Sequence, residues 1–283
     1  MTDKSYPYIV FVFILIFSVT GCERYQEPLY TGIEKQYATL PENMIAWNDD
    51  RSVSARYVDP TLRYNHGILG DKIEAGGLLV IKNKRQYYFK LDETFVFEDL
   101  QPRLKDVDND GELEFITIQT SLNFGASVCV YKIILDRLLP YAQSGFIGMP
   151  YRWLNIAAID DLDGDGTIEI AWVQTPHIGG VLKISRIEND SLRVVDEIAG
   201  VSNHLNGSRN LCLSAVTSVN HLKRLYVPTD PHDAMVGFRF ENDHLVAQDT
   251  IALKINPAIP LFQQYNFQNL IAETNCIYFP GNH

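Results

Sequence analysis

The sequence predicts an all-β fold, namely a β-propeller-like array of about four to five four-stranded blades of about 55 residues each. An acidic loop occurs twice at a spacing of 55 residues, and each copy leads into a segment rich in β-branched and aromatic residues. Weaker repeats extend the same period in both directions. Such a period indicates stacked repeats, because one small sheet cannot bury both of its faces alone.

The chain begins with a segment typical of an exported protein. Ile9–Val19 is an apolar run of 11 residues, shorter than the roughly 20 residues of a membrane-spanning helix and typical of a signal peptide. The run Val19-Thr20-Gly21-Cys22 resembles the bacterial lipobox. We therefore expect a signal peptide over 1–21 and lipidation at Cys22, with an ordinary secretory signal as the alternative.

The lipobox resemblance implies a location at the bacterial cell envelope. The protein would be held at a membrane by a lipid on Cys22, with a tether over residues 22–40. Glu23 stands where aspartate is the usual inner-membrane retention signal, so the outer membrane is favoured over the inner membrane. The net charge of −11 argues against nucleic acid as a partner, because phosphate backbones repel an acidic surface.

Residues 41–283 are expected to form a single domain. Strand-like runs at Gly77–Asn83 and Gln86–Leu91 indicate a divergent unit before the first acidic loop, and Asn275–Phe279 is a candidate strand near the end of the chain. That strand could pair with the segment between Tyr30 and Trp47 and so close a ring. The predicted units are 45–100, 101–154, 155–208 and 209–258, followed by closing strands over 259–283.

The two acidic loops predict a metal site each, because Ca²⁺ takes six to eight oxygen ligands and a curled chain can supply them from nearby residues. The first set comprises Asp106, Asp108, Asp110, the carbonyl of Glu112, and Glu114. The second comprises Asp161, Asp163, Asp165, the carbonyl of Thr167, and Glu169. The last carboxylate is ninth in the loop, not twelfth as in an EF-hand. The alternative is a solvated acidic turn that binds no metal.

The pattern DxDxDGxxE followed by a strand and a small-residue turn such as Asn123–Ser127 resembles the FG-GAP or VCBS-type repeat of integrin-α-like propellers and bacterial secreted proteins. The resemblance covers roughly 51–251 and implies a propeller with structural Ca²⁺ in its loops. Seven blades are usual in that family, and this chain is too short for seven. The family implies no definite activity.

A further unit from about Leu211 to Ile251 has lost its acidic loop, since Ser218–Lys223 stands where the aspartates would be. This unit is expected to hold no metal. Pro176-His177 recurs there as Pro231-His232. The two histidines are the nearest approach to a functional pair, but their repeated structure explains them adequately as residues of blade turns.

The function predicted from the sequence is non-enzymatic. No nucleophile elbow, zinc-protease motif or phosphate-binding glycine loop is present in the sequence. The cluster Tyr141, Tyr151, Arg152 and Trp153 is expected to pack between blades, with a sugar- or peptide-binding ledge as the alternative. We expect a binding or scaffold module for an unknown protein or glycan. The alternative is a polysaccharide-active lyase or hydrolase on the same scaffold.

Three cysteines follow Cys22, namely Cys129, Cys212 and Cys276. All three stand in strand-like apolar contexts, where thiols pack as small hydrophobic groups. An odd number permits one disulfide and one remaining thiol, so the sequence leaves the pairing open.

Overall fold

The computed structural model describes residues 37–219 and 221–253. The predicted leader, Cys22, Cys276 and the closing strands over 259–283 lie outside the described residues. Within the described residues, no helix has the length and apolar character that crossing a bilayer would require.

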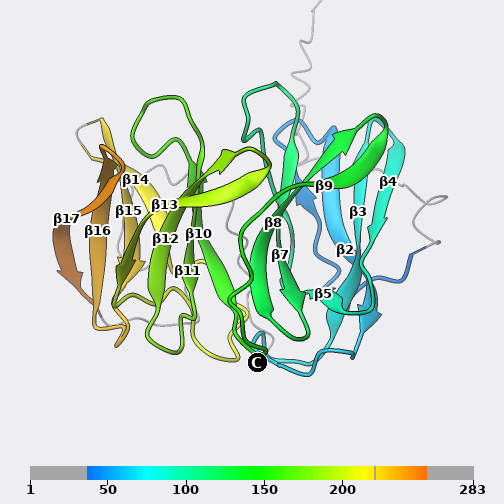
Figure 1. Cartoon of the computed structure of the whole chain (residues 1–283), viewed down its shortest axis with the longest axis horizontal. Coiled ribbons are helices and arrows are strands. Elements are labelled where there is room, and N and C mark those ends of the chain that lie inside the picture. The colour runs from blue at the N-terminus through cyan, green and yellow to red at the C-terminus, as the bar shows by residue number, and fades with distance from the viewer. Residues whose placement is uncertain (1–36, 220, 254–283) are drawn as a thin grey trace, which may run out of the picture. The chain divides into compact units, whose positions relative to one another are not determined.

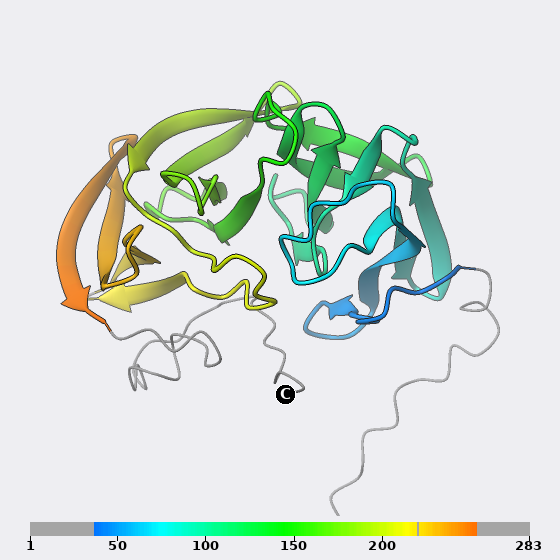
Figure 2. The same cartoon turned by 90° about the horizontal axis from the view of Figure 1, so that it is seen from below.

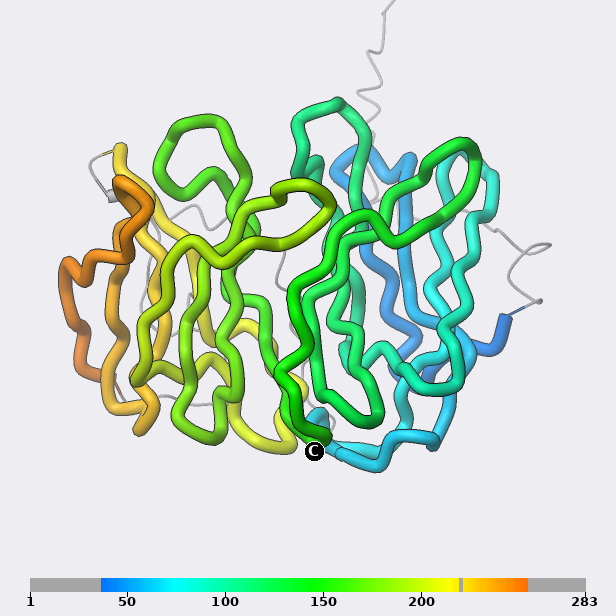
Figure 3. The backbone as a smooth tube through the Cα atoms, viewed as in Figure 1, coloured from blue at the N-terminus to red at the C-terminus, as the bar shows by residue number. Residues whose placement is uncertain are grey.

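The described part of the chain is all-β, as predicted, and contains seventeen strands. Sixteen of them form four antiparallel meanders of four strands each (Figures 1 and 3). The first meander comprises β1 (Ala46–Trp47), β2 (Val53–Thr61), β3 (Glu74–Lys82) and β4 (Arg85–Lys90); the second, β6 (Arg103–Lys105), β7 (Glu114–Ser121), β8 (Gly125–Ile134) and β9 (Arg137–Gln143); the third, β10 (Leu154–Asp160), β11 (Glu169–Gln174), β12 (Val181–Glu188) and β13 (Ser191–Ala199); the fourth, β14 (Ala215–Val219), β15 (Leu222–Pro228), β16 (Ala234–Glu241) and β17 (His244–Ala252).

Hydrogen bonds join the first three meanders into one 13-stranded mixed sheet, and the fourth meander forms a separate sheet. The additional strand β5 (Phe95–Phe97) pairs with both β3 and β7. A single parallel pair, Gln143 with Ser191, connects β9 to β13. The meanders follow one another along an arc (Figure 2), and the described strands do not close it into a barrel or ring.

The core lies between successive meanders, because successive residues of a strand point to opposite faces of its sheet. In β7, Ile116 and Ile118 pack in a cluster with Ile170 of the third meander, whereas Phe115 joins a cluster with Leu78 of the first. A third cluster joins Val173 and Leu182 to Leu225 and Phe238 of the fourth meander. All eight residues of β7 are buried, since both faces of its sheet are covered.

The links between strands gather at two ends of the molecule. The acidic end carries the first link of each of the first three meanders, 48–52, 106–113 and 161–168, and lies at the top of Figure 1. The loop end lies opposite and faces the viewer in Figure 2. It comprises the turns 62–73, 122–124, 175–180 and 229–233 and the connections 91–102, 144–153 and 200–214.

Candidate functional site

The two acidic loops each gather three of the predicted ligands. Carboxylate oxygens of Asp106, Asp108 and Glu114 lie within 4.8 Å of one another, as do those of the corresponding residues Asp161, Asp163 and Glu169. Each triad could hold a metal ion. The predicted ligands Asp110 and Asp165 lie in the same loops but outside these triads.

Hydrogen bonds within each loop hold the carboxylates in place. The Gly111 N–H donates to Asp106 Oδ2 at 2.9 Å, and the Val107 N–H donates to Glu114 Oε2 at 2.9 Å. Gly111 has a φ of 87°, which glycine adopts without the steric cost that other residues pay. The second loop repeats both bonds with Gly166 to Asp161 Oδ2 at 3.1 Å and Leu162 to Glu169 Oε2 at 2.8 Å.

The residues predicted to contribute carbonyl ligands lie in the turns of these loops. The Glu112 N–H donates to Asp110 Oδ1 at 2.9 Å, and the Thr167 N–H donates to Asp165 Oδ1 at 2.7 Å. The side chain of Glu112 forms an ion pair with Lys82 at the end of β3, so its carboxylate is directed toward the first meander.

The first loop offers oxygen atoms that suit a cation. Two buried oxygens, Asp106 Oδ1 and Asp108 Oδ1, accept no hydrogen bond from the described residues. The Nζ atom of Lys132 in β8 forms ion pairs here, at 2.9 Å from Glu114 Oε1, 2.5 Å from Asp108 Oδ2 and 2.8 Å from Asp110 Oδ2. Burial raises the pKa of Glu114, whereas its hydrogen bonds with the Val107 N–H and with Lys132 act to lower it. Carboxylate oxygens without donors are the ligands that Ca²⁺ prefers.

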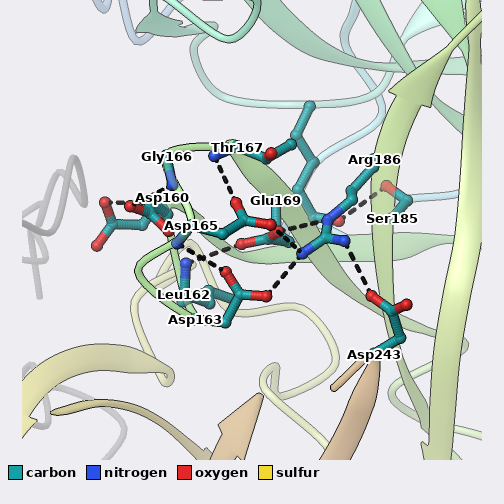
Figure 4. A network of polar contacts seen from close by, with 12 residues as sticks. Asp160, Leu162, Asp163, Asp165, Gly166, Thr167, Glu169, Ser185, Arg186 and Asp243 are labelled. Atoms are coloured by element: carbon teal, nitrogen blue, oxygen red, sulfur yellow. Dashed lines mark hydrogen bonds and ion pairs between the residues drawn. The ribbon is translucent and has the colours of Figure 1, made fainter. Parts of the chain in front are cut away.

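The second loop contains an arginine from β12 (Figure 4). Arg186 Nε lies 2.7 Å from Glu169 Oε1, and Nη2 lies 2.7 Å from Asp163 Oδ2 and 3.3 Å from Asp165 Oδ2. Its Nη1 lies 2.9 Å from Asp243 Oδ1 in the turn between β16 and β17. This guanidinium therefore joins the second loop to the fourth meander.

The loop end contains a buried carboxylate–imidazole pair. His66 Nδ1 lies 2.6 Å from Glu98 Oε1, and Thr120 Oγ1 donates to Glu98 Oε2 at 2.8 Å. Glu98 is fully buried. Burial raises the pKa of Glu98, whereas the hydrogen bond and charge of His66 act against that rise. A carboxylate held against Nδ1 orients the ring and leaves Nε2 as its second polar atom.

A second imidazole pair lies at the same end. His177 Nε2 is 2.9 Å from His204 Nδ1, and His204 Nε2 is 2.8 Å from the Ser208 carbonyl oxygen. Burial lowers the pKa of His204 to about 3, so its ring is neutral near pH 7. A carbonyl only accepts, so His204 Nε2 carries the proton and Nδ1 accepts from His177 Nε2–H. A neutral His177 then carries its proton on Nε2, and its Nδ1 is the nitrogen that can accept a proton.

Aromatic side chains lie beside both imidazole pairs. The ring of Tyr151 stacks on Tyr64 at 5.1 Å and lies 5.5 Å from His66. The Trp153 ring is parallel to His177 at 6.3 Å, and its Nε1–H donates to the Glu98 carbonyl at 2.9 Å. The segment 151–153 thus contacts both pairs.

Several residues suggested by the sequence meet at this end. His177 and His232 both lie in its turns, and burial, then the charges of His66 and His232, lower the pKa of His177. Tyr141 lies elsewhere, since its ring centroid is 5.1 Å from Lys132 Nζ beside the first acidic loop.

Four residues of this end were not predicted from the sequence, namely Tyr64, His66, Glu98 and His204. They stand in irregular segments between strands, where no periodicity marks them. The one usable signal was positional: His66, His177 and His232 all lie in the turn between the second and third strands of a meander.

No family model matches this chain, and no curated protein matches it. Solved structures similar to it include the rhamnogalacturonan lyase of Bacillus licheniformis, at 13% identity and a TM-score of 0.38 over 62% of this chain and 42% of that one. The exotype rhamnogalacturonan lyase YesX shows 13% identity and a TM-score of 0.38 over 76% of this chain and 51% of that one. A putative 6-phosphogluconolactonase of Bacteroides fragilis shows 12% identity and a TM-score of 0.41 over 76% and 57%.

The matched region covers 42% to 57% of the length of these proteins, which is less than two thirds in each case. At TM-scores of this size the similarity establishes neither a shared fold nor a shared activity.

Proposed function

We propose that this chain is a binding module, in which a propeller-like array of FG-GAP or VCBS-type repeats presents the loop end to a protein or glycan ligand. One observation carries the proposal. Of the eight large apolar side chains that the described residues expose, five lie in turns and connections of the loop end: Leu62, Phe124, Met149, Tyr151 and Ile178. Apolar side chains concentrated on one face of a molecule mark an interaction surface.

Ring and hydrogen-bond contacts place the segments that carry these side chains next to one another. Tyr151 stacks on Tyr64 of the turn 62–73. The Gly148 N–H donates to the Phe124 carbonyl at 2.8 Å, and the Thr175 N–H donates to the Trp153 carbonyl at 2.9 Å. Aromatic rings beside imidazoles supply both apolar area and hydrogen-bonding groups, which suits a glycan or a peptide.

The binding test compares two exposed apolar positions at opposite ends. Tyr151 is 48% exposed at the loop end, and Leu135 is 92% exposed in the hairpin between β8 and β9. We expect the protein to bind a member of a glycan array or a component of an envelope extract. Tyr151→Ala should weaken that binding by about tenfold or more, the scale of a central aromatic contact, and Leu135→Ala should leave it unchanged. Equal effects of the two substitutions would refute the placement of the site.

We also propose that Ca²⁺ stabilises this module at the first acidic loop, supported by the two buried oxygens without donors, Asp106 Oδ1 and Asp108 Oδ1. Extracellular calcium modules bind at about 10⁻⁴ to 10⁻³ M, so millimolar Ca²⁺ would add on the order of 0.5 to 1.5 kcal/mol. Chelation should lower the melting temperature, and Asp108→Asn should remove the response. A melting curve indifferent to chelator would exclude this role.

The proposed module is attached to the cell envelope by a lipid on Cys22, with the outer membrane favoured. This part rests on the sequence Val19-Thr20-Gly21-Cys22. The substitution Cys22→Ala should abolish acyl labelling and move the protein from the membrane to the soluble fraction. Unchanged membrane association of this variant would exclude the lipid anchor.

A second candidate function, a polysaccharide-active lyase or hydrolase, is favoured by the two imidazole pairs at the loop end. His66 against Glu98 and His177 against His204 each leave one ring nitrogen able to take a proton, as a general base requires. Release of unsaturated or shortened sugars, abolished by both His66→Gln and His177→Gln, would establish this candidate over the binding module. Binding without turnover would exclude it.

A further inference from the structure

We propose that the two acidic loops are not equivalent: the first binds a metal ion, and in the second the guanidinium of Arg186 occupies the place of that ion. The chain would then bind one Ca²⁺ and not the two that the repeated motif predicts. This inference rests on the calcium part of the proposed function and specifies it.

The carboxylates of the second loop are fully paired. Asp161 accepts from the N–H groups of Gly164 and Gly166, at 2.7 and 3.1 Å. The other three acidic side chains each pair one oxygen with a backbone N–H and the other with Arg186: Asp163 with Asp165 N–H, Asp165 with Thr167 N–H, and Glu169 with Leu162 N–H. Each of the eight carboxylate oxygens therefore has a donor, with which a metal ion would have to compete.

The first loop differs at its fourth position. Gly164 of the second loop donates its N–H to Asp161 Oδ1, whereas the corresponding Asp106 Oδ1 is buried and accepts no hydrogen bond. Asn109 stands at this position in the first loop, and its side chain donates to the Gly166 carbonyl at 2.8 Å. Together with Asp108 Oδ1, this leaves two buried oxygens of the triad without a donor.

The basic residue also differs between the loops. Lys132 and Arg186 occupy equivalent positions in the third strands of their meanders, β8 and β12. Each stands one residue after the partner of the first apolar residue of the preceding strand: Tyr131 pairs with Phe115, and Ser185 pairs with Ile170. Lys132 is a single ammonium that contacts one oxygen each of Asp108, Asp110 and Glu114. It leaves Asp106 Oδ1 and Asp108 Oδ1 without a donor. Arginine has five donors in a planar fork and can satisfy several carboxylates at once.

An ion entering the second loop would have to displace Arg186. It would take Glu169 Oε1 and Asp163 Oδ2, which lie 2.7 Å from Nε and Nη2. The guanidinium, whose side chain is 17% exposed, would retain Asp243 as its acidic partner at 2.9 Å. Breaking a largely buried ion pair costs more than breaking an exposed one, so Ca²⁺ competes poorly at this loop.

The test is the number of ions that the full-length protein binds, measured by isothermal titration with CaCl₂ after chelation. We expect one ion per chain in the wild type, none in Asp108→Asn, and one in the matched variant Asp163→Asn. Arg186→Ala should bind two, because it frees the second loop, whereas Lys132→Ala should still bind one.

The outcomes separate this inference from the proposal on which it rests. Two ions in the wild type, loss of an ion in Asp163→Asn, or a single ion in folded Arg186→Ala would overturn the role of Arg186 alone. If Arg186→Ala does not fold, Asp163→Asn decides the question. A wild-type protein that binds no ion would overturn both this inference and the calcium proposal.

Discussion

Protonation of His204 in the unfolded chain should destabilise the fold below neutral pH. The side chain is fully buried, its Nδ1 faces His177 Nε2, and its Nε2 faces the Ser208 carbonyl. Burial is the largest cause of its lowered pKa, and the charges of His177 and His232 lower the pKa further, to about 3. The folded protein therefore keeps this ring neutral at pH values where the unfolded chain protonates it.

The magnitude follows from the difference between the two pKa values, about 3 in the fold and 6.5 when unperturbed. Between these values the unfolded state binds one more proton than the folded state, so the free energy of unfolding falls as pH falls. Each pH unit in this range changes it by about 1.4 kcal/mol. From pH 7 to pH 5 the group should cost about 2 kcal/mol of stability, since the loss begins near the unperturbed value.

The assay is urea unfolding at pH 7 and pH 5, followed by tryptophan fluorescence, with saturating Ca²⁺ in both buffers. His204→Asn should be less stable than the wild type at pH 7 by about 1 to 3 kcal/mol, because partners of the ring lose their hydrogen bonds. It should lose about 2 kcal/mol less than the wild type between the two pH values. Burial also raises the pKa of Glu98 and of Glu74, so protonation of these carboxyl groups favours the folded state as pH falls. The wild type and His204→Asn share this effect, which cancels in the comparison. Equal losses in the two proteins would refute the reasoning.

Two stability predictions concern packing. Gly125 has a φ of 74°, and a Cβ there would lie 2.8 Å from the Arg152 carbonyl oxygen, so Gly125→Ala should cost about 2 to 3 kcal/mol. Gly148→Ala, with no atom within 4 Å, should cost about 1 kcal/mol; equal melting temperatures would contradict the steric argument. Ile118 is fully buried, so Ile118→Ala should cost about 2 to 5 kcal/mol, and Leu135→Ala at a site 92% exposed should cost less than about 0.5 kcal/mol in chemical denaturation.

The all-β fold was predictable because strand signals are local. The β-rich segment predicted after the first acidic loop, residues 115–120, lies within β7, Glu114–Ser121, and its β-branched residues suit a sheet covered on both faces. The acidic triads were likewise accessible, since their members stand within nine residues of one another. The pairing of Arg186 with this loop was not accessible, because it depends on the register between β11 and β12 and on a turn of the fourth meander.

The loop end could not be predicted for the same reason. His66 and Glu98 are 32 residues apart, and His177 and His204 are 27 apart. They meet because turns and connections of successive meanders end at one side of the arc (Figure 2). A single sequence gives the spacing within a repeat but not the contacts between irregular segments of different repeats.

The two ends of the molecule are under different physical constraints, and this explains where a ligand would bind. The strands repeat because their faces must pack against the next meander, and at the acidic end ion pairs and loop hydrogen bonds occupy most polar groups. The turns of the loop end carry His66, Phe124, His177 and His232 in successive meanders, and apolar side chains such as Leu62 and Ile178 stay exposed in the same turns. Histidine stands in this turn in three of the four meanders, and Phe124 interrupts the series in the second. We therefore expect a ligand to bind at the loop end, where exposed apolar side chains lie beside these histidines, and not at the acidic end.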